Sequence, residues 1–249
     1  MSFDFAYFGK LPAFGDFLRH NASKPEMQNF DKWLQEGLYY AKNALKPDFE
    51  NHFASLTMSF FYPDKETGNI LVGGLKASND QIGRHYPFYV TLLIRDPNHQ
   101  DFQKFSLSPI IERFLQRVFL FISKVTHYED AALIEQEFDQ FIQSLMTDSN
   151  SKDRTQLMTP MNSNTSGQSA ISLNGINGGY QIKIDSGEPK TIYSKMENFS
   201  WESYIPCLFW HAESQVKFLY VFGKTPSPKI FINLLDVDSK NGLVKNLSK

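Results

Sequence analysis

The sequence contains only one cysteine, Cys207, among 249 residues. A single thiol cannot form an intramolecular disulfide, and it excludes a zinc site built from several thiolates. Because Cys207 lies in an apolar run, we expect a small buried hydrophobe and not a nucleophile. The chain also lacks a run of roughly 18 apolar residues that could cross a bilayer, and residues 1–5 do not resemble a secretion signal. We therefore expect a protein of the reducing cytoplasm with no direct membrane insertion.

The sequence also lacks a large excess of positive or negative charge. The sequence has 25 Lys and Arg against 27 Asp and Glu, which gives a formal net charge of -2. This balance provides no electrostatic reason for the whole chain to bind nucleic acid, so we expect no nucleic-acid partner. Hydrophobic residues make up 41% of the chain, which is enough to build the core of one compact unit. The composition does not show whether the chain self-associates.

Known catalytic and metal-binding patterns are missing too. Gly9 and Lys10 are followed by Leu11, where a phosphate-binding loop requires Ser or Thr. The six histidines show no His-x-x-x-His spacing, and no Gly-x-Ser-x-Gly elbow marks a nucleophile. Gly73 and Gly74 lack the dinucleotide-binding pattern and indicate a bulge, a turn or close backbone packing. We predict no catalytic residue, no metal and no cofactor, although a Ser–His–Asp arrangement formed only in space stays open.

Hydrophobic periodicity predicts helices and strands in alternating blocks. Aromatic alternation at residues 3–8 indicates a short strand, and apolar residues at helical spacing indicate a helix from Pro25 that ends before Pro47. The remaining predicted elements are a hairpin of strands 56–62 and 69–76, a buried strand 88–94, helices 109–124 and 129–146, strands 180–184, 207–211 and 217–222, and a final helix opening near Ser227 and Pro228. Such blocks favour a layered α/β sandwich.

Two short loops combine glycine and proline with acidic and basic residues. The first loop, residues 9–17, reads GKLPAFGDF, and the second loop, residues 78–87, reads SNDQIGRHYP. Aspartates in such loops usually accept hydrogen bonds from nearby backbone N–H groups. The favoured interpretation is therefore structural: Asp16 and Asp80 hold their own turns, and the basic residues of the loops pair with them.

A functional interpretation of the same loops stays open. Lys10, Arg19, Arg84 and His85 could converge on an anion, because backbone amides near glycines can also line an anion-binding nest. If the two loop aspartates joined them, the loops would enclose a polar pocket. That arrangement would fit a ligand-binding or hydrolytic module.

The two loops and residues 31–38, which read DKWLQEGL, occur in an order that resembles the TagF family of type VI secretion-associated proteins, also called ImpM. The resemblance is strongest over residues 5–93, and residues 206–210 resemble part of the family's closing region. It implies a three-layer α/β/α sandwich with a mixed central sheet. It also implies a single TagF-like domain over residues 1–249. Within it, the polar composition of residues 147–168 indicates a surface loop and a candidate sub-lobe boundary.

The same resemblance implies a function. A TagF-like chain is expected to be a bacterial, non-enzymatic regulator that represses type VI secretion after translation. It is expected to act by binding a forkhead-associated scaffold protein. Besides the ligand-binding or hydrolytic module, a third class remains open, which is a structural accessory subunit of the secretion apparatus.

We hypothesise that the two loops lie close together and form or support the surface that contacts the partner. Arginine and aromatic side chains are common anchors of protein interfaces, and both occur here. The polar members of the predicted surface are Lys10, Asp16, Arg19, Asp80 and Arg84, and its apolar members are Phe14 and Phe17.

Overall fold

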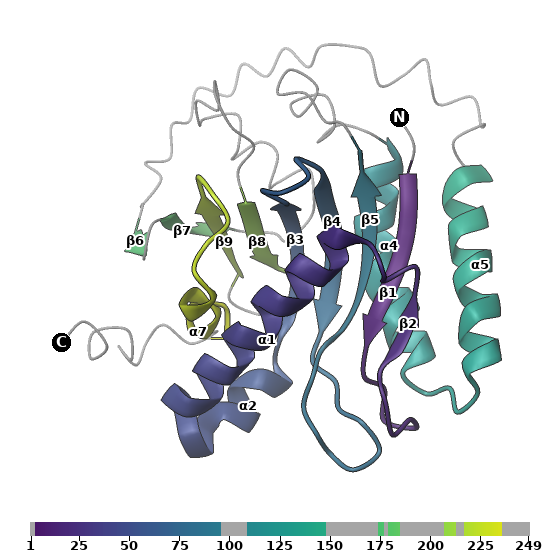
Figure 1. The fold of residues 1–249 in the computed structure, drawn as a ribbon, viewed down its shortest axis with the longest axis horizontal. Coiled ribbons are helices and arrows are strands. Elements are labelled where there is room, and N and C mark those ends of the chain that lie inside the picture. Colours follow the sequence, from purple (N-terminus) through teal and green to yellow (C-terminus); the bar gives the residue numbers. More distant parts are fainter. Residues whose placement is uncertain are drawn as a thin grey trace.

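The computed structural model describes residues 3–95, 109–147, 174–176, 179–184, 207–212 and 217–235. These residues form a nine-stranded sheet with the strand order β2-β1-β5-β4-β3-β8-β9-β7-β6 (Figure 1). Its strands are β1 (Phe3–Gly9), β2 (Leu18–His20), β3 (Thr57–Pro63), β4 (Ile70–Lys76), β5 (Phe88–Ile94), β6 (Asn174–Ile176), β7 (Gly179–Ile184), β8 (Cys207–His211) and β9 (Lys217–Phe222).

Every pairing between the described strands is antiparallel, so the expectation of a mixed sheet is wrong. A parallel pair needs a crossover connection between neighbouring strands. Here several neighbours, such as β3 and β4, follow each other directly in the chain. The helical segments instead join β2 to β3 and β5 to β6, which are not neighbours in the sheet. The coarser expectation of an α/β protein is confirmed.

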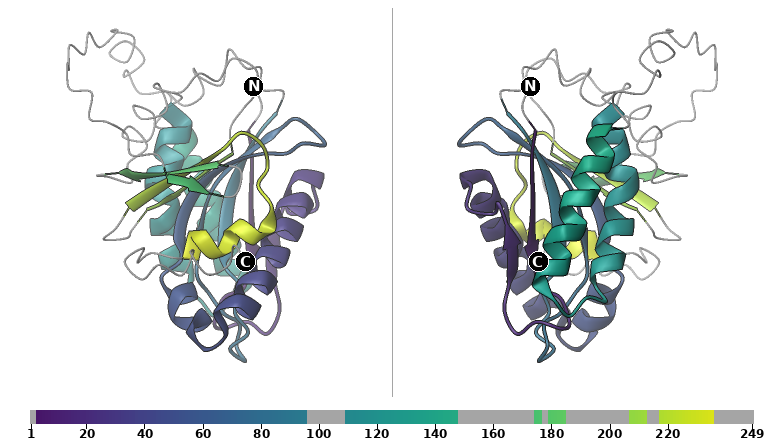
Figure 2. Two further views of the ribbon diagram at one scale, coloured as in Figure 1. Left: turned by 90° about the vertical axis from the view of Figure 1, so that its left-hand side faces the viewer. Right: turned by 90° about the vertical axis from the view of Figure 1, so that its right-hand side faces the viewer.

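Helices lie against both faces of the sheet (Figure 1, Figure 2). One face carries α1 (Pro25–Leu45), α2 (Phe49–Ala54) and α7 (Phe231–Leu235), with the 3-10 turns η1 (Lys46–Asp48) and η4 (Pro228–Ile230) beside them. The opposite face carries α4 (Pro109–Val125) and α5 (Ala131–Thr147). Among the helices of the described residues, none is long and apolar enough to cross a membrane.

The strands supply one hydrophobic cluster to each face of the sheet. In β5, Val90 and Leu92 join the cluster that includes α4, whereas Tyr89 and Leu93 join the cluster that includes α1. All seven residues of β5 are buried, because helices cover both sides of the middle of the sheet. The predicted buried strand 88–94 is confirmed.

Helix α1 links the N-terminal half of the sheet to the C-terminal part of the chain. Its apolar residues recur at helical spacing, and Pro25 occupies the first turn, where a missing N–H costs no intrahelical hydrogen bond. The helix ends at Leu45, as predicted. Trp33 is only 5% exposed, and its indole Nε1 donates a 2.8 Å hydrogen bond to the carbonyl of Pro226. This bond ties α1 to the segment that leads into η4.

Three short elements were not predicted from the sequence: β2, β6, and the turn from η1 into α2. Strands β2 and β6 have three residues each, and α2 has six. So few residues give almost no periodic signal, and their conformation depends on the elements beside them. The candidate boundary in the polar loop 147–168 lies, apart from Thr147, outside the described residues.

Gly73 and Gly74 allow β4 to pack closely on both faces. A Cβ on Gly73 would lie 2.3 Å from the Phe60 ring and 2.7 Å from the carbonyl oxygen of Val90. A Cβ on Gly74 would lie 2.7 Å from the side chain of Val118 on α4. Of the interpretations predicted for this pair, close backbone packing is confirmed.

We expect Gly73→Ala to lower the free energy of unfolding by about 1–3 kcal/mol, the usual cost of overpacking a core. The added methyl group would collide with a buried ring and with backbone, neither of which can move freely. Gly15→Ala is the matched control, because the nearest neighbour of its Cβ would be Gln81 Oε1 at 3.8 Å. Urea denaturation measures both variants, and equal stability of the two would contradict the packing argument.

Candidate functional site

The two loops emerge at the same end of the sheet (Figure 1). The first loop follows β1, and the second loop precedes β5. Because β1 and β5 are antiparallel neighbours, with Phe8 opposite Tyr89, the end of one strand lies beside the start of the other. The proximity assumed from the sequence is therefore a consequence of the strand order.

Gly9, at the start of the first loop, packs directly against the end of the second loop. Its φ angle is 139°, which residues with a side chain rarely adopt. A Cβ at this position would lie 2.2 Å from the carbonyl oxygen of Pro87 and 2.6 Å from the Cα of Phe88. Contact with the second loop therefore explains why the first loop begins with glycine.

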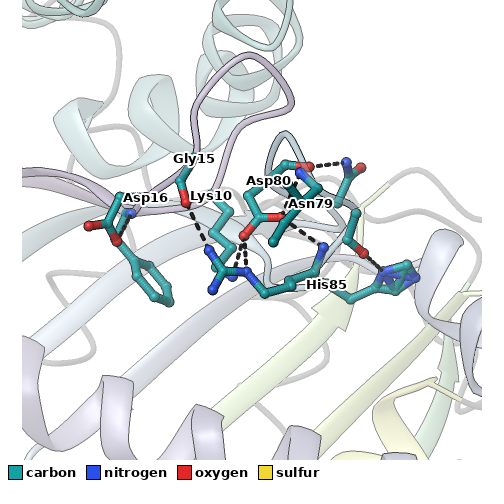
Figure 3. A network of polar contacts seen from close by, with 10 residues as sticks. Lys10, Gly15, Asp16, Asn79, Asp80 and His85 are labelled. Atoms are coloured by element: carbon teal, nitrogen blue, oxygen red, sulfur yellow. Dashed lines mark hydrogen bonds and ion pairs between the residues drawn. The ribbon is translucent and has the colours of Figure 1, made fainter.

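A buried carboxylate, that of Asp80, lies at the centre of the contact (Figure 3). Its Oδ2 atom accepts hydrogen bonds from Lys10 Nζ at 2.7 Å and from Arg84 Nε at 2.6 Å. Its Oδ1 atom accepts hydrogen bonds from the backbone N–H groups of Arg84 at 2.8 Å and Ile82 at 3.2 Å. Burial alone would raise the pKa of Asp80, but the hydrogen bonds from Lys10 and Arg84 hold it well below its usual range.

Further contacts join the two loops directly. Arg84 Nη2 donates a 2.8 Å hydrogen bond to the carbonyl of Gly15, and the backbone N–H of Gln81 donates one of 2.9 Å to the carbonyl of Phe14. The Lys10 ammonium also lies 5.0 Å from the centre of the Phe17 ring, a distance suited to a cation–π contact. Ionic, backbone and aromatic contacts thus hold the loops as one unit.

The third segment of the resemblance, residues 31–38, reaches the same unit through α1. The Phe17 ring packs edge-on against Tyr86 at 5.0 Å and stacks on Phe8 at 5.0 Å. The Tyr86 hydroxyl donates a hydrogen bond to Asp31. Burial raises the pKa of Asp31. Asp31 also accepts hydrogen bonds from Tyr86 and from Gln35, and these two bonds oppose the rise. The three motifs therefore meet in space.

The predicted surface residues separate into three groups by exposure. Lys10 and Asp80 are buried, at 6% and 0% exposed, so they support the loops from inside. Phe14 and Phe17 are half-buried. Of the seven predicted surface residues, Asp16, Arg19 and Arg84 are the exposed ones.

Two of the residues considered for a polar pocket do not meet Asp80. The Asp16 carboxylate accepts a 2.8 Å hydrogen bond from the backbone N–H of Phe17, within its own turn (Figure 3). The His85 ring stacks on Phe53 of α2 at 5.4 Å between ring centres. Both aspartates accept hydrogen bonds within their own turns, as the structural interpretation predicts. Lys10 and Arg84, however, both pair with Asp80.

A cavity of about 420 Å³ lies away from the loops. It is formed by α1, the turn after β3 and the segment before η4, and its buried members include Trp33, Tyr62 and Asp64. The Asp64 carboxylate already accepts hydrogen bonds from Asn29 and from Thr67. Three segments that are distant in the sequence therefore line the cavity. The buried Asp64 carboxylate holds the turn after β3 and is already hydrogen-bonded.

Ile82, at the tip of the second loop, is an exposed residue that was not predicted from the sequence. This side chain is 72% exposed, among the highest values for large hydrophobic residues in the described part of the chain. The available signal was an aliphatic residue at the centre of an otherwise polar loop.

A comparison with protein families gives a match over more than half of the chain. The family described as TagF N-terminal domain, Type VI secretion system-associated, matches residues 6–145. The chain belongs to the TagF family. The matched TagF region contains both loops and α1, so the network around Asp80 lies entirely within it.

A comparison with solved structures supports the same fold. The crystal structure of PA0076 from Pseudomonas aeruginosa PAO1 aligns with this TagF chain at a TM-score of 0.56 and 17% sequence identity. The alignment covers 93% of this chain and 94% of PA0076. At this identity the likeness establishes a shared fold. A search of curated proteins gave no significant match.

We expect Asp80→Asn to lower the melting temperature by roughly 6 °C or more, because the change leaves Lys10 buried without a counter-charge. Asp16→Asn is the matched control, since it makes the same chemical change on an exposed carboxylate. We expect that control to shift the melting temperature by less than roughly 2 °C. Differential scanning calorimetry measures both shifts, and similar values would show that the buried pair does not hold the loops.

The lowered pKa of Asp80 also predicts a pH dependence. The carboxylate contributes stability at every pH above its unfolded pKa of about 3.9, and this contribution is lost as the pH falls towards the lower folded pKa. The stability gap between the wild type and Asp80→Asn should therefore be constant above about pH 5 and narrow below about pH 4. Urea denaturation across this range measures the gap, and a gap that widened in acid would contradict the assignment.

Proposed function

We propose that this TagF chain is a non-enzymatic, cytoplasmic regulator that represses type VI secretion after translation by binding a forkhead-associated scaffold protein. Membership of a family associated with type VI secretion supports the choice of pathway. The observation that carries the binding role is the construction of the two loops. Three of their charged groups, Lys10, Asp80 and Arg84, are bonded to one another, so what the loops offer to other molecules is an outer surface.

The proposed contact surface is the outer side of the two loops. Its exposed polar members are Asp16 and Arg84 on the loops and Arg19 on the adjoining strand β2. The half-buried Phe14 and Phe17 contribute at its margin. Lys10 and Asp80 act from beneath by fixing the relative position of the loops. A preorganised surface of this kind loses little conformational freedom on binding, which favours recognition of a protein.

The alternative of a hydrolytic module between the loops has less support. A general base or nucleophile must reach its substrate with a free lone pair. Both oxygens of Asp80 accept hydrogen bonds from the loops themselves, and a cation pairs with this carboxylate from each loop. The 420 Å³ cavity lies on other segments, beside α1 and η4.

The regulator and the structural subunit make opposite predictions for secretion. If the chain is a repressor, deleting its gene should raise the release of a type VI effector, and overproduction should lower it. If the chain is a structural subunit, deletion should abolish release. Immunoblotting of the effector in culture supernatants distinguishes the two, with a deletion of a core sheath component as the control for background release.

Binding is tested by a pull-down from the cytoplasm with the tagged chain. We expect the wild type to recover the forkhead-associated scaffold protein. Arg19→Ala alters an exposed residue of β2, directly after the first loop, and Gln136→Ala on α5 is an exposed control on the opposite face of the sheet from α1. Weaker recovery with Arg19→Ala alone would support the loops as the interface. Failure of the folded wild type to recover the scaffold would contradict the proposed function.

A further inference from the structure

Ile82 is presented to solvent by the tip of the second loop. Its side chain is 72% exposed, and its neighbours Gln81 and Gly83 are exposed as well. Burying a large aliphatic side chain in an interface is favourable in proportion to the apolar area that leaves water. An exposed isoleucine at a loop tip is therefore a potential anchor, provided that the loop holds it in one position.

The loop does hold Ile82 in one position. Asp80 accepts three hydrogen bonds from successive residues: from the N–H of Ile82 at 3.2 Å, of Gly83 at 2.9 Å and of Arg84 at 2.8 Å. Gly83 has a φ of 82°, which suits glycine, and this turn reverses the chain directly after Ile82. The backbone of the tip is thus ordered before any partner arrives, which removes much of the entropic cost of binding.

A positive charge lies beside this apolar tip. Lys10 and Arg84 share the single carboxylate of Asp80, so these three side chains together carry a net charge of +1. The Lys10 side chain is buried, whereas that of Arg84 is 57% exposed. A guanidinium has five N–H donors in one plane, of which Nε bonds Asp80 and Nη2 bonds Gly15. The charge that faces solvent is therefore that of Arg84, already fixed in orientation.

We propose that Ile82 and Arg84 form a two-part anchor for a partner protein whose surface has an aliphatic socket bordered by carboxylates. This inference rests on the proposed function and specifies the chemistry of the surface that the scaffold protein presents. Ile82 fills the socket, and Arg84 pairs with the carboxylates at its edge. Charge complementarity selects an acidic partner surface and speeds its encounter with the loops.

Exposure alone does not distinguish Ile82, because single exposed aliphatic residues are common on protein surfaces. Leu120 on α4 is 71% exposed and provides the comparison. It lies on α4, which packs on the opposite face of the sheet from α1. The two residues match in size and exposure, so Leu120→Ser is the control for Ile82→Ser.

The test measures binding of the purified forkhead-associated scaffold protein to the purified chain by biolayer interferometry. We expect Ile82→Ser to weaken binding by roughly ten-fold or more and Leu120→Ser to change it by less than roughly two-fold. Both variants should keep the wild-type melting temperature, because neither side chain is buried. Raising the salt concentration should slow association of the wild type, as expected for steering by opposite charges.

The outcomes separate this inference from the proposed function. If the wild type binds the scaffold and Ile82→Ser binds equally well, the anchor is wrong and the proposed function stands. If association does not depend on salt, the carboxylate border of the socket is wrong. If the folded wild type does not bind the scaffold at any concentration tested, the proposed function fails, and the anchor fails with it.

Discussion

The organisation of this protein's candidate site depends on one buried carboxylate, that of Asp80. A charge removed from water must be paired and hydrogen-bonded, or the fold loses several kcal/mol. Lys10 from the first loop and Arg84 from the second loop provide the charges, and backbone N–H groups satisfy the remaining lone pairs. Because Lys10 belongs to the first loop and Asp80 to the second, separating the loops breaks this buried ion pair. The shape of the surface above them follows from this constraint.

The charged residues of the TagF motifs therefore have different roles from those that their residue types alone suggest. A buried ion pair contributes little net stability compared with well-packed apolar residues, but it can enforce one arrangement over others. Here it fixes the position of the loop tip that carries Ile82, together with the orientation of the Arg84 guanidinium. The recognisable residues of the motifs build the support, and less conspicuous neighbours provide the exposed area. This division explains how a family signature can lie largely beneath the surface that it shapes.

The antiparallel sheet extends this rigidity beyond the matched TagF region. The family match ends at residue 145, yet β8 pairs with β3 and continues the same sheet into β9 and β7. On one face, Trp33 of α1 bonds the carbonyl of Pro226, which brings the C-terminal segment against the N-terminal helix. The alignment with PA0076 over most of both chains agrees with a fold that includes these later strands. The loops are thus supported by elements from both ends of the chain.

Local patterns in the sequence determined most of the helices and strands, the family and the two loops. The strand 88–94 and the long helix from Pro25 could be predicted because periodicity and proline placement act over a few residues. Strand direction was predicted wrongly, since it depends on which strands become neighbours, and that is a property of the whole chain. Likewise, nothing local to Asp80 shows that both cations bind it, that His85 turns towards α2, or that Ile82 is left in solvent. Only the tertiary structure decided these points, because burial and charge pairing depend on residues far apart in sequence.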